Sequence, residues 1–183
     1  RVLGRTRDDA AGEAYDKVAR LFGLGYPGGP EIDARAATGN PRAVQFPRPF
    51  LEGSWDFSFS GLKTSVLYHL RDHPGPMRGR RLADLCASFQ EAVAETLVEK
   101  TIAAARRFEV KDIVIGGGVA ANSRLRVLMR RRAQAAGFAV RLPSRILCTD
   151  NAAMIAHVGG CLLRARRARA GRADPALALR SWA

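Results

Sequence analysis

Three consecutive glycines between an apolar segment and a helical segment are the feature that most constrains this chain. The segment 112–115 is Asp112 followed by three β-branched apolar residues, which is typical of a short strand buried in a parallel sheet. The glycine run 116–118 follows it, and residues 123–136 then carry a helical pattern that ends at Gly137. Residues 138–142 predict a second strand. This strand–helix–strand order with short connections predicts an α/β fold.

The glycine run also has a chemical meaning. Glycines let backbone N–H groups approach a ligand closely, and the N-terminus of the following helix attracts anions. The turn is therefore a candidate cradle for a phosphate or a nucleotide, although it is neither a Walker loop nor a dinucleotide fingerprint. The alternative is a tight strand-to-helix turn in which Asn122 is a plain N-cap.

The rest of the chain is predicted to be mostly helical. Apolar spacing predicts helices over 8–22, 31–37, 61–70, from Asp84 onward and over 152–167, a short strand over 56–60, and a loop over 39–54. Asp8 or Asp9 is expected to cap the first helix, and Asp84 the long one. A stiff turn is expected over 26–30, because proline fixes φ and glycine adopts conformations closed to other residues.

Two carboxylates flank the predicted stiff turn. Asp16 precedes it and Asp33 follows it. Each alone would be an ordinary solvated residue. An ionised carboxylate only accepts hydrogen bonds, however, and a ribose supplies two neighbouring hydroxyl donors. The pair is therefore a candidate site for vicinal hydroxyls.

One further carboxylate is a candidate metal ligand. Asp150 directly precedes the last predicted helix, where it is either an N-cap or a hard oxygen ligand for a divalent metal. A single carboxylate does not hold a metal, so its partners must come from elsewhere. His69 and His73 are spaced i, i+4, but Pro74 follows at once. We expect a solvated helix end there rather than a pair of ligands.

The net charge indicates the class of partner, and the cysteine content indicates the cellular compartment. The 183 residues include 30 Lys+Arg and 17 Asp+Glu, a net charge of +13. This excess favours a polyanion such as nucleic acid or an anionic membrane surface, although GC-rich coding would also produce it. Three widely spaced cysteines without a Cys-x-x-Cys pair indicate a reducing, cytoplasmic location. No segment approaches the ~20 apolar residues of a membrane span, so no membrane partner is expected.

Five motifs in order resemble the tRNA N6-adenosine threonylcarbamoyltransferase family, called TsaD or Gcp in bacteria. They lie at 8–17, 26–30, 57–64, 116–122 and 148–156. The resemblance is to the C-terminal half of the family. It implies that 1–162 form the C-terminal nucleotide-binding lobe of a two-lobe, actin/Hsp70/sugar-kinase-like (ASKHA) α/β fold. We expect 163–183 to be a partly disordered Arg/Ala-rich tail, and the N-terminal lobe to be absent from this chain.

The resemblance also implies an activity and a set of site residues. The family moves the threonylcarbamoyl group from threonylcarbamoyl-AMP to N6 of adenosine 37 in tRNAs that read codons beginning with A, the t6A modification. It implies that Asp16, Gly29, Asp33 and Asn122 bind the adenylate, and that Asp150 is a ligand of one Fe²⁺ ion. No residue is a convincing general base, so no catalytic residue is assigned.

The family's remaining metal ligands are a His-x-x-x-His pair on the N-terminal lobe, a role that we do not transfer to His69 and His73. The implied partners are threonylcarbamoyl-AMP, tRNA, a paralogous subunit and other proteins of the t6A pathway. We expect this chain to be inactive alone, with the apolar residues of its last helix exposed, among them Ile155, Val158 and Leu162. Two alternatives remain: a lobe of an ATP-dependent small-molecule kinase of the same fold, and a non-catalytic RNA- or partner-binding remnant that uses its arginines.

Overall fold

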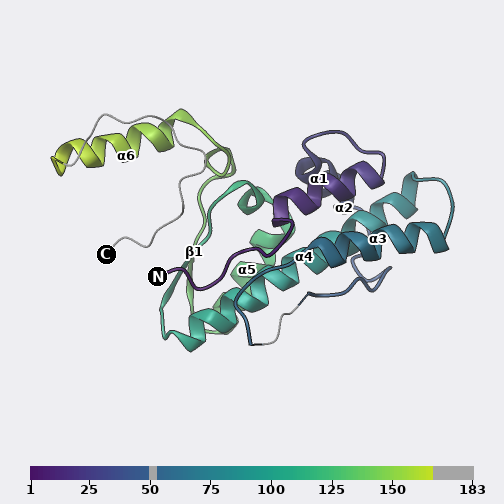
Figure 1. Ribbon diagram of the computed structural model, residues 1–183, viewed down its shortest axis with the longest axis horizontal. Coiled ribbons are helices and arrows are strands. Elements are labelled where there is room, and N and C mark those ends of the chain that lie inside the picture. The colour runs from purple at the N-terminus through teal and green to yellow at the C-terminus, as the bar shows by residue number, and fades with distance from the viewer. Residues whose placement is uncertain (50–52, 167–183) are drawn as a thin grey trace.

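The computed structural model describes residues 1–49 and 53–166 (Figure 1). The predicted tail lies mostly outside these residues. In chain order the elements are α1 (Ala11–Leu21), α2 (Gly28–Ala36), α3 (Ser60–Asp72), α4 (Gly79–Arg107), β1 (Asp112–Val114), η1 (Gly118–Ala121), α5 (Ser123–Ala135), β2 (Ala139–Arg141), η2 (Arg145–Leu147) and α6 (Ala152–Arg164), where η marks a 3₁₀ turn.

The 29-residue helix α4 organises the chain, because both apolar clusters pack against it. Its first half packs with α1, α2 and α3, and its second half with α5 and the strands (Figure 1). The first cluster includes Tyr15, Phe22, Ile32, Leu62 and Phe89. The second includes Val98, Ile113, Leu128 and Met129. Burying these side chains is the main driving force for folding.

The predicted strand–helix–strand unit is confirmed. Strands β1 and β2 are parallel, with Ile113 opposite Val140, and α5 connects them. The prediction that the first strand is wholly buried is wrong. Only Ile113 is buried, and the side chain of Val114 is 72% exposed. In the described chain the sheet has two strands, and only one of its faces packs on helices. Successive side chains of a strand point to opposite faces, so every second side chain points to solvent.

Two predicted boundaries are wrong. The stretch 26–30 is not a free turn, because Gly28, Gly29 and Pro30 already form the first turn of α2. Helix α4 begins at Gly79 rather than at Asp84. The Asp84 carboxylate lies inside the helix and accepts a hydrogen bond from the backbone of Asn40 at 2.6 Å, which ties the 39–54 loop to α4.

The predicted cap of the first helix is also wrong. The N-cap of α1 is Ala10, which makes no side-chain cap bond. The Asp8 carboxylate instead caps α3, where it accepts from the backbone N–H groups of Phe59 (2.8 Å) and Ser60 (3.2 Å) and from the hydroxyls of Ser58 and Ser60. The predicted strand over 56–60 is reduced to one parallel bridge, between Thr6 and Phe57.

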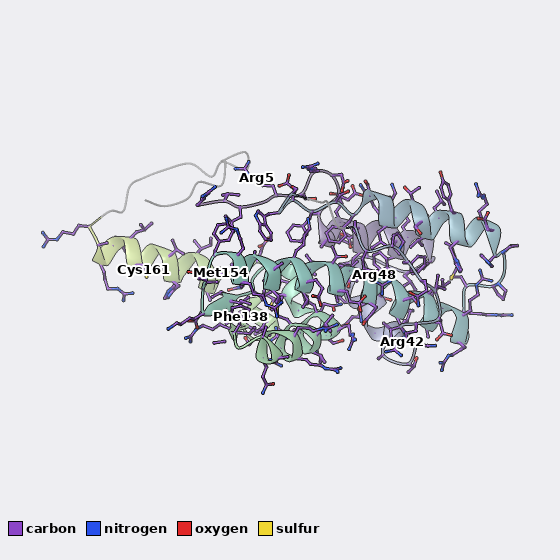
Figure 2. The ribbon with its side chains drawn as sticks, turned by 90° about the horizontal axis from the view of Figure 1, so that it is seen from below. Arg5, Arg42, Arg48, Phe138, Met154 and Cys161 are labelled. Carbon is purple, nitrogen blue, oxygen red and sulfur yellow. The ribbon has the colours of Figure 1, made fainter. Side chains whose placement is uncertain are left out.

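Helix α6 stands apart from the two clusters. None of its residues is buried, and Ile155, Val158 and Leu162 are 77%, 55% and 38% exposed, which confirms the prediction of an exposed apolar face. Figure 2 shows the helix, marked by Met154 and Cys161, extending beyond the rest of the described chain. No helix among the described residues is both long and apolar enough to cross a membrane.

The Asp8 cap makes stability depend on pH. Burial opposes the charged form, but the hydrogen bonds from Ser58, Ser60 and Phe59 outweigh it and lower the pKa of Asp8 from 3.8 to about 2. Stability from this group is complete above its unfolded pKa and is lost as the pH falls from about 4 to about 2. Because Asp8 is exposed to solvent, we expect Asp8→Asn to cost only about 1 kcal/mol at pH 7. The cost should be smaller at pH 2, where about half of the Asp8 carboxyls of the folded chain are protonated. Urea unfolding at both pH values measures this difference.

The matched control is Asp72→Asn, which removes an exposed carboxylate whose one ion-pair partner in the described part of the chain is its neighbour Arg71. We expect little change in its unfolding midpoint. Equal stability of Asp8→Asn and the wild type at pH 7 would show that the cap does not stabilise α3.

Candidate functional site

A cavity of about 600 Å³ lies where α1, α2, η1, the start of α5 and the segment after β2 meet. Four of the five predicted site residues line it: Asp16, Gly29, Asp33 and Asn122. They come from parts of the sequence as far apart as the first and the fifth helix. Asp150 does not line the cavity, although its neighbour Thr149 does.

Asp33 joins α2 to the N-terminus of α5. Both of its carboxylate oxygens accept from the backbone N–H of Ser123, at 3.2 and 3.1 Å. One oxygen also accepts from the Ser123 hydroxyl at 2.5 Å and from the Asn122 amide at 3.3 Å. A carboxylate is stabilised here because the first N–H groups of a helix lack partners and carry partial positive charge.

Asn122 is the N-cap of α5, as predicted for a tight strand-to-helix turn. Its side-chain oxygen accepts from the backbone of Leu125 at 2.9 Å, and its amide donates to Gln90 of α4 at 2.7 Å. The adjacent Glu91 forms a two-pronged ion pair with Arg124. Helices α2 and α4 therefore both hold the first turn of α5 in place. The predicted contact of Asn122 with an adenylate stays a prediction.

Asp16 has the corresponding role at α2. One of its oxygens accepts from the backbone N–H of Gly28 at 2.7 Å. Its second oxygen has no hydrogen-bond partner among the described residues, and in Asp33 the second oxygen accepts only from Ser123. Since each carboxylate oxygen has two lone pairs, both acids keep acceptor capacity inside the cavity.

Gly28 and Gly29 of α2 differ in what an added Cβ would contact. A Cβ on Gly28 would lie 2.6 Å from the Cβ of Ala19 and 2.7 Å from the backbone oxygen of Tyr15, so packing of α1 on α2 requires glycine there. A Cβ on Gly29 would meet nothing within 4 Å, and Gly29 lines the cavity. Its missing side chain leaves room for a ligand.

The glycine run 116–118 contributes less than expected. Gly117 has φ +84°, a conformation that favours glycine, and it precedes η1. Of the three glycines, only Gly118 lines the cavity. Val119, Ala121 and Asn122 of the same turn also line the cavity, so the turn adjoins a space for a ligand. That the turn holds a phosphate or a nucleotide stays a prediction.

Sequence reasoning missed three polar side chains that line the cavity: Tyr15, Arg145 and Thr149. Tyr15 is only 2% exposed and lies on the apolar stripe that predicted α1. Burial, and then the nearby carboxylates of Asp33 and Glu91, raise the pKa of Tyr15, so its hydroxyl stays neutral. Tyr15 and Thr149 each adjoin a predicted site residue, which is the signal that could have found them. Arg145 has no such signal.

Asp150 is exposed, and the residue that caps α6 is its neighbour Asn151, whose side chain accepts from Met154 at 3.1 Å. The N-cap alternative for Asp150 is therefore wrong. Within 1–49 and 53–166, no group of three His, Cys, Asp or Glu side chains is placed to hold a metal. His73 is the C-cap of α3, and its Nδ1 lies 3.1 Å from the backbone oxygen of His69, which confirms a helix end.

Comparison with known proteins relates the chain to one family. The family model described as tRNA N6-adenosine threonylcarbamoyltransferase matches residues 1–157. A protein with that name from Endomicrobium trichonymphae is 50% identical over the whole chain, which covers 54% of that relative. One from an Anaeromyxobacter species is 56% identical over 96% of the chain, again covering 54% of the relative. The chain thus spans about half the length of these relatives.

A solved structure supports the fold alone. The crystal structure of HypF from T. kodakarensis superposes on 86% of this chain with a TM-score of 0.63 and 24% sequence identity, and the match covers 20% of that protein. The described elements therefore adopt a fold related to part of HypF.

The two glycines of α2 give a matched pair of variants. We expect Gly28→Ala to destabilise the chain by about 2 kcal/mol, because the new Cβ meets backbone atoms that do not move easily. We expect Gly29→Ala to keep or slightly raise the melting temperature, since alanine favours a helix by up to about 1 kcal/mol, and to weaken binding of AMP. Thermal unfolding and calorimetric titration measure both. Unchanged AMP affinity in Gly29→Ala would show that no ligand approaches this wall.

Proposed function

The chain belongs to the tRNA N6-adenosine threonylcarbamoyltransferase family, and we propose that it supplies one wall of that enzyme's adenylate site. The whole enzyme would move the threonylcarbamoyl group from threonylcarbamoyl-AMP to N6 of adenosine 37 in tRNAs that read codons beginning with A. One observation carries the proposal: Asp16, Gly29, Asp33 and Asn122, singled out from the sequence, line a single cavity. Since the chain spans about half of its relatives, it would bind the adenylate but not complete the transfer alone.

Asp16 and Asp33 would accept hydrogen bonds from the two ribose hydroxyls. Each holds a helix N-terminus and still has acceptor capacity within the cavity. Hydrogen bonds to a charged group are the stronger kind, typically about 1.5–3 kcal/mol each. Gly29 leaves space for the ligand. Asn122 caps α5 and lines the cavity where that helix begins. These residues bind and orient the adenylate.

The proposed transfer balances as an acyl transfer. The N6 amine of adenosine attacks the carbonyl carbon of the threonylcarbamoyl group, the bond from that carbon to the phosphate oxygen breaks, and AMP leaves. The amine loses one proton to solvent. The described residues supply a fixed position for the leaving AMP, which lowers the barrier by orientation rather than by proton transfer.

We propose that the described residues form one lobe of a two-lobe ASKHA fold. The superposition on part of HypF supports a related fold. In that arrangement the cavity of this chain would be one side of a cleft between two lobes. Asp150 is exposed and would be one ligand of the proposed Fe²⁺, but the described residues do not fit a complete metal site. The other ligands would come from outside these residues.

The partners proposed beyond the adenylate are tRNA, a paralogous subunit and other proteins of the t6A pathway, in the cytoplasm. The net charge of +13 supports a tRNA substrate, because phosphate contacts dominate nucleic-acid affinity. Arg130 and Arg131 of α5 are exposed, whereas Arg132 pairs with Glu99 at 3.4 Å. No observation favours the kinase alternative.

The ribose assignment has a direct test by calorimetry with AMP and 2′,3′-dideoxy-AMP. We expect the wild type to bind AMP about a hundredfold more tightly than the dideoxy analogue, a difference of about 2.7 kcal/mol. Asp16→Asn should reduce this preference to about tenfold, because Asp33 still accepts from the other hydroxyl. Asp33→Asn should reduce it similarly and also lower the melting temperature, because Asp33 caps α5. In the full-length protein both variants should lower transfer of threonylcarbamoyl to tRNA.

The matched control is Asp112→Asn, which removes an exposed carboxylate on β1 that pairs with Arg141. It should keep the preference for AMP. An Asp16→Asn variant that still discriminates AMP from its dideoxy analogue as the wild type does would contradict the ribose assignment.

A further inference from the structure

Arg145 is the one cationic side chain among the described residues that line the cavity. The same cavity holds two carboxylates, Asp16 and Asp33. Arg145 forms no ion pair with either of them, and its guanidinium has no hydrogen-bond partner in the part of the chain that the structure describes. The cavity is therefore lined by a guanidinium and two carboxylates that do not contact one another. A ligand can lie between them.

Arg145 stands on a segment that is held at both ends. Before it, the largely buried Arg126 donates to the backbone oxygen of Pro143 at 2.7 Å and to that of Ala120, in η1, at 2.8 Å. After it, Cys148 is 3% exposed, and its Sγ accepts from Nη1 of the same Arg126 at 3.8 Å. These bonds fasten η2 against η1, so the backbone of Arg145 has a fixed position at the cavity.

The charges come from different walls. The two acids belong to α1 and α2, whereas Arg145 belongs to η2, which contacts η1. A ligand that satisfies both walls has hydroxyl donors at one end and an anion at the other. A guanidinium presents several N–H donors in a plane, which matches the oxygens of a phosphate.

We propose that Arg145 is a specificity-determining residue that pairs with the phosphate of a bound nucleoside monophosphate group. The inference rests on the proposed function, because it takes the ribose to lie at Asp16 and Asp33. It adds that the cavity selects 5′-phosphorylated nucleosides over free nucleosides, and that this chain supplies the cation that does so.

Calorimetric titration with AMP and with adenosine, at low and at physiological salt, tests the proposal on this chain. The wild type should bind AMP about tenfold more tightly than adenosine, with the difference shrinking as salt is added. Arg145→Ala should lose about tenfold in AMP affinity and nothing in adenosine affinity. Arg145→Lys should fall between the two, because it keeps the charge but not the planar set of donors.

The matched control is Arg20→Ala, which removes an exposed arginine of α1 that does not line the cavity. It should bind both ligands as the wild type does. If Arg145→Ala keeps the wild-type ratio of AMP to adenosine affinity, Arg145 does not read the phosphate, and the ribose assignment is untouched. If the wild type binds neither ligand, the proposed function fails and the role of Arg145 fails with it.

Discussion

The candidate site depends on one contact, between the Asp33 carboxylate and the first turn of α5. It joins residues 90 positions apart, and no other described hydrogen bond links α2 to α5. Gln90 holds Asn122 from a third helix at 2.7 Å. The first N–H groups of a helix have no partner within the helix and are stabilised by an acceptor. Here the Asp33 carboxylate of α2 is that acceptor for α5, so the glycine turn that precedes α5 lies beside α2. The cavity forms between them.

The same acids would then serve folding and binding. Asp16 uses one oxygen to hold the start of α2, and Asp33 uses most of its capacity to hold α5. What remains is a small number of fixed acceptors on a rigid wall. Fixed acceptors of this kind favour binding, because little conformational entropy is lost when a ligand arrives. Arg145, which has no side-chain partner within 1–49 and 53–166, adds a donor to the same cavity.

Local sequence patterns predicted most helices, the parallel strand pair and the Asp16 and Asp33 pair, and the family resemblance added Gly29 and Asn122 as binding residues. They succeeded where the signal is short-range, as in the apolar stripe of α1 or the Asn122 cap. They failed where a carboxylate caps a helix distant in sequence. Asp8 caps α3 across 51 residues, and Asp84 binds the backbone of Asn40 across 44. Arg145 was missed because only the tertiary anchoring by Arg126 brings it to the cavity.

The most direct measurement is the backbone amide NMR spectrum of this chain during titration with AMP. The account predicts that the amide signals of Gly29, Gly118 and Ser123 shift together with one dissociation constant, while those of the distant Gly61 and Gly160 stay in place. Shifts confined to residues away from the cavity, or none at millimolar AMP, would contradict the claim that these segments form one adenylate wall.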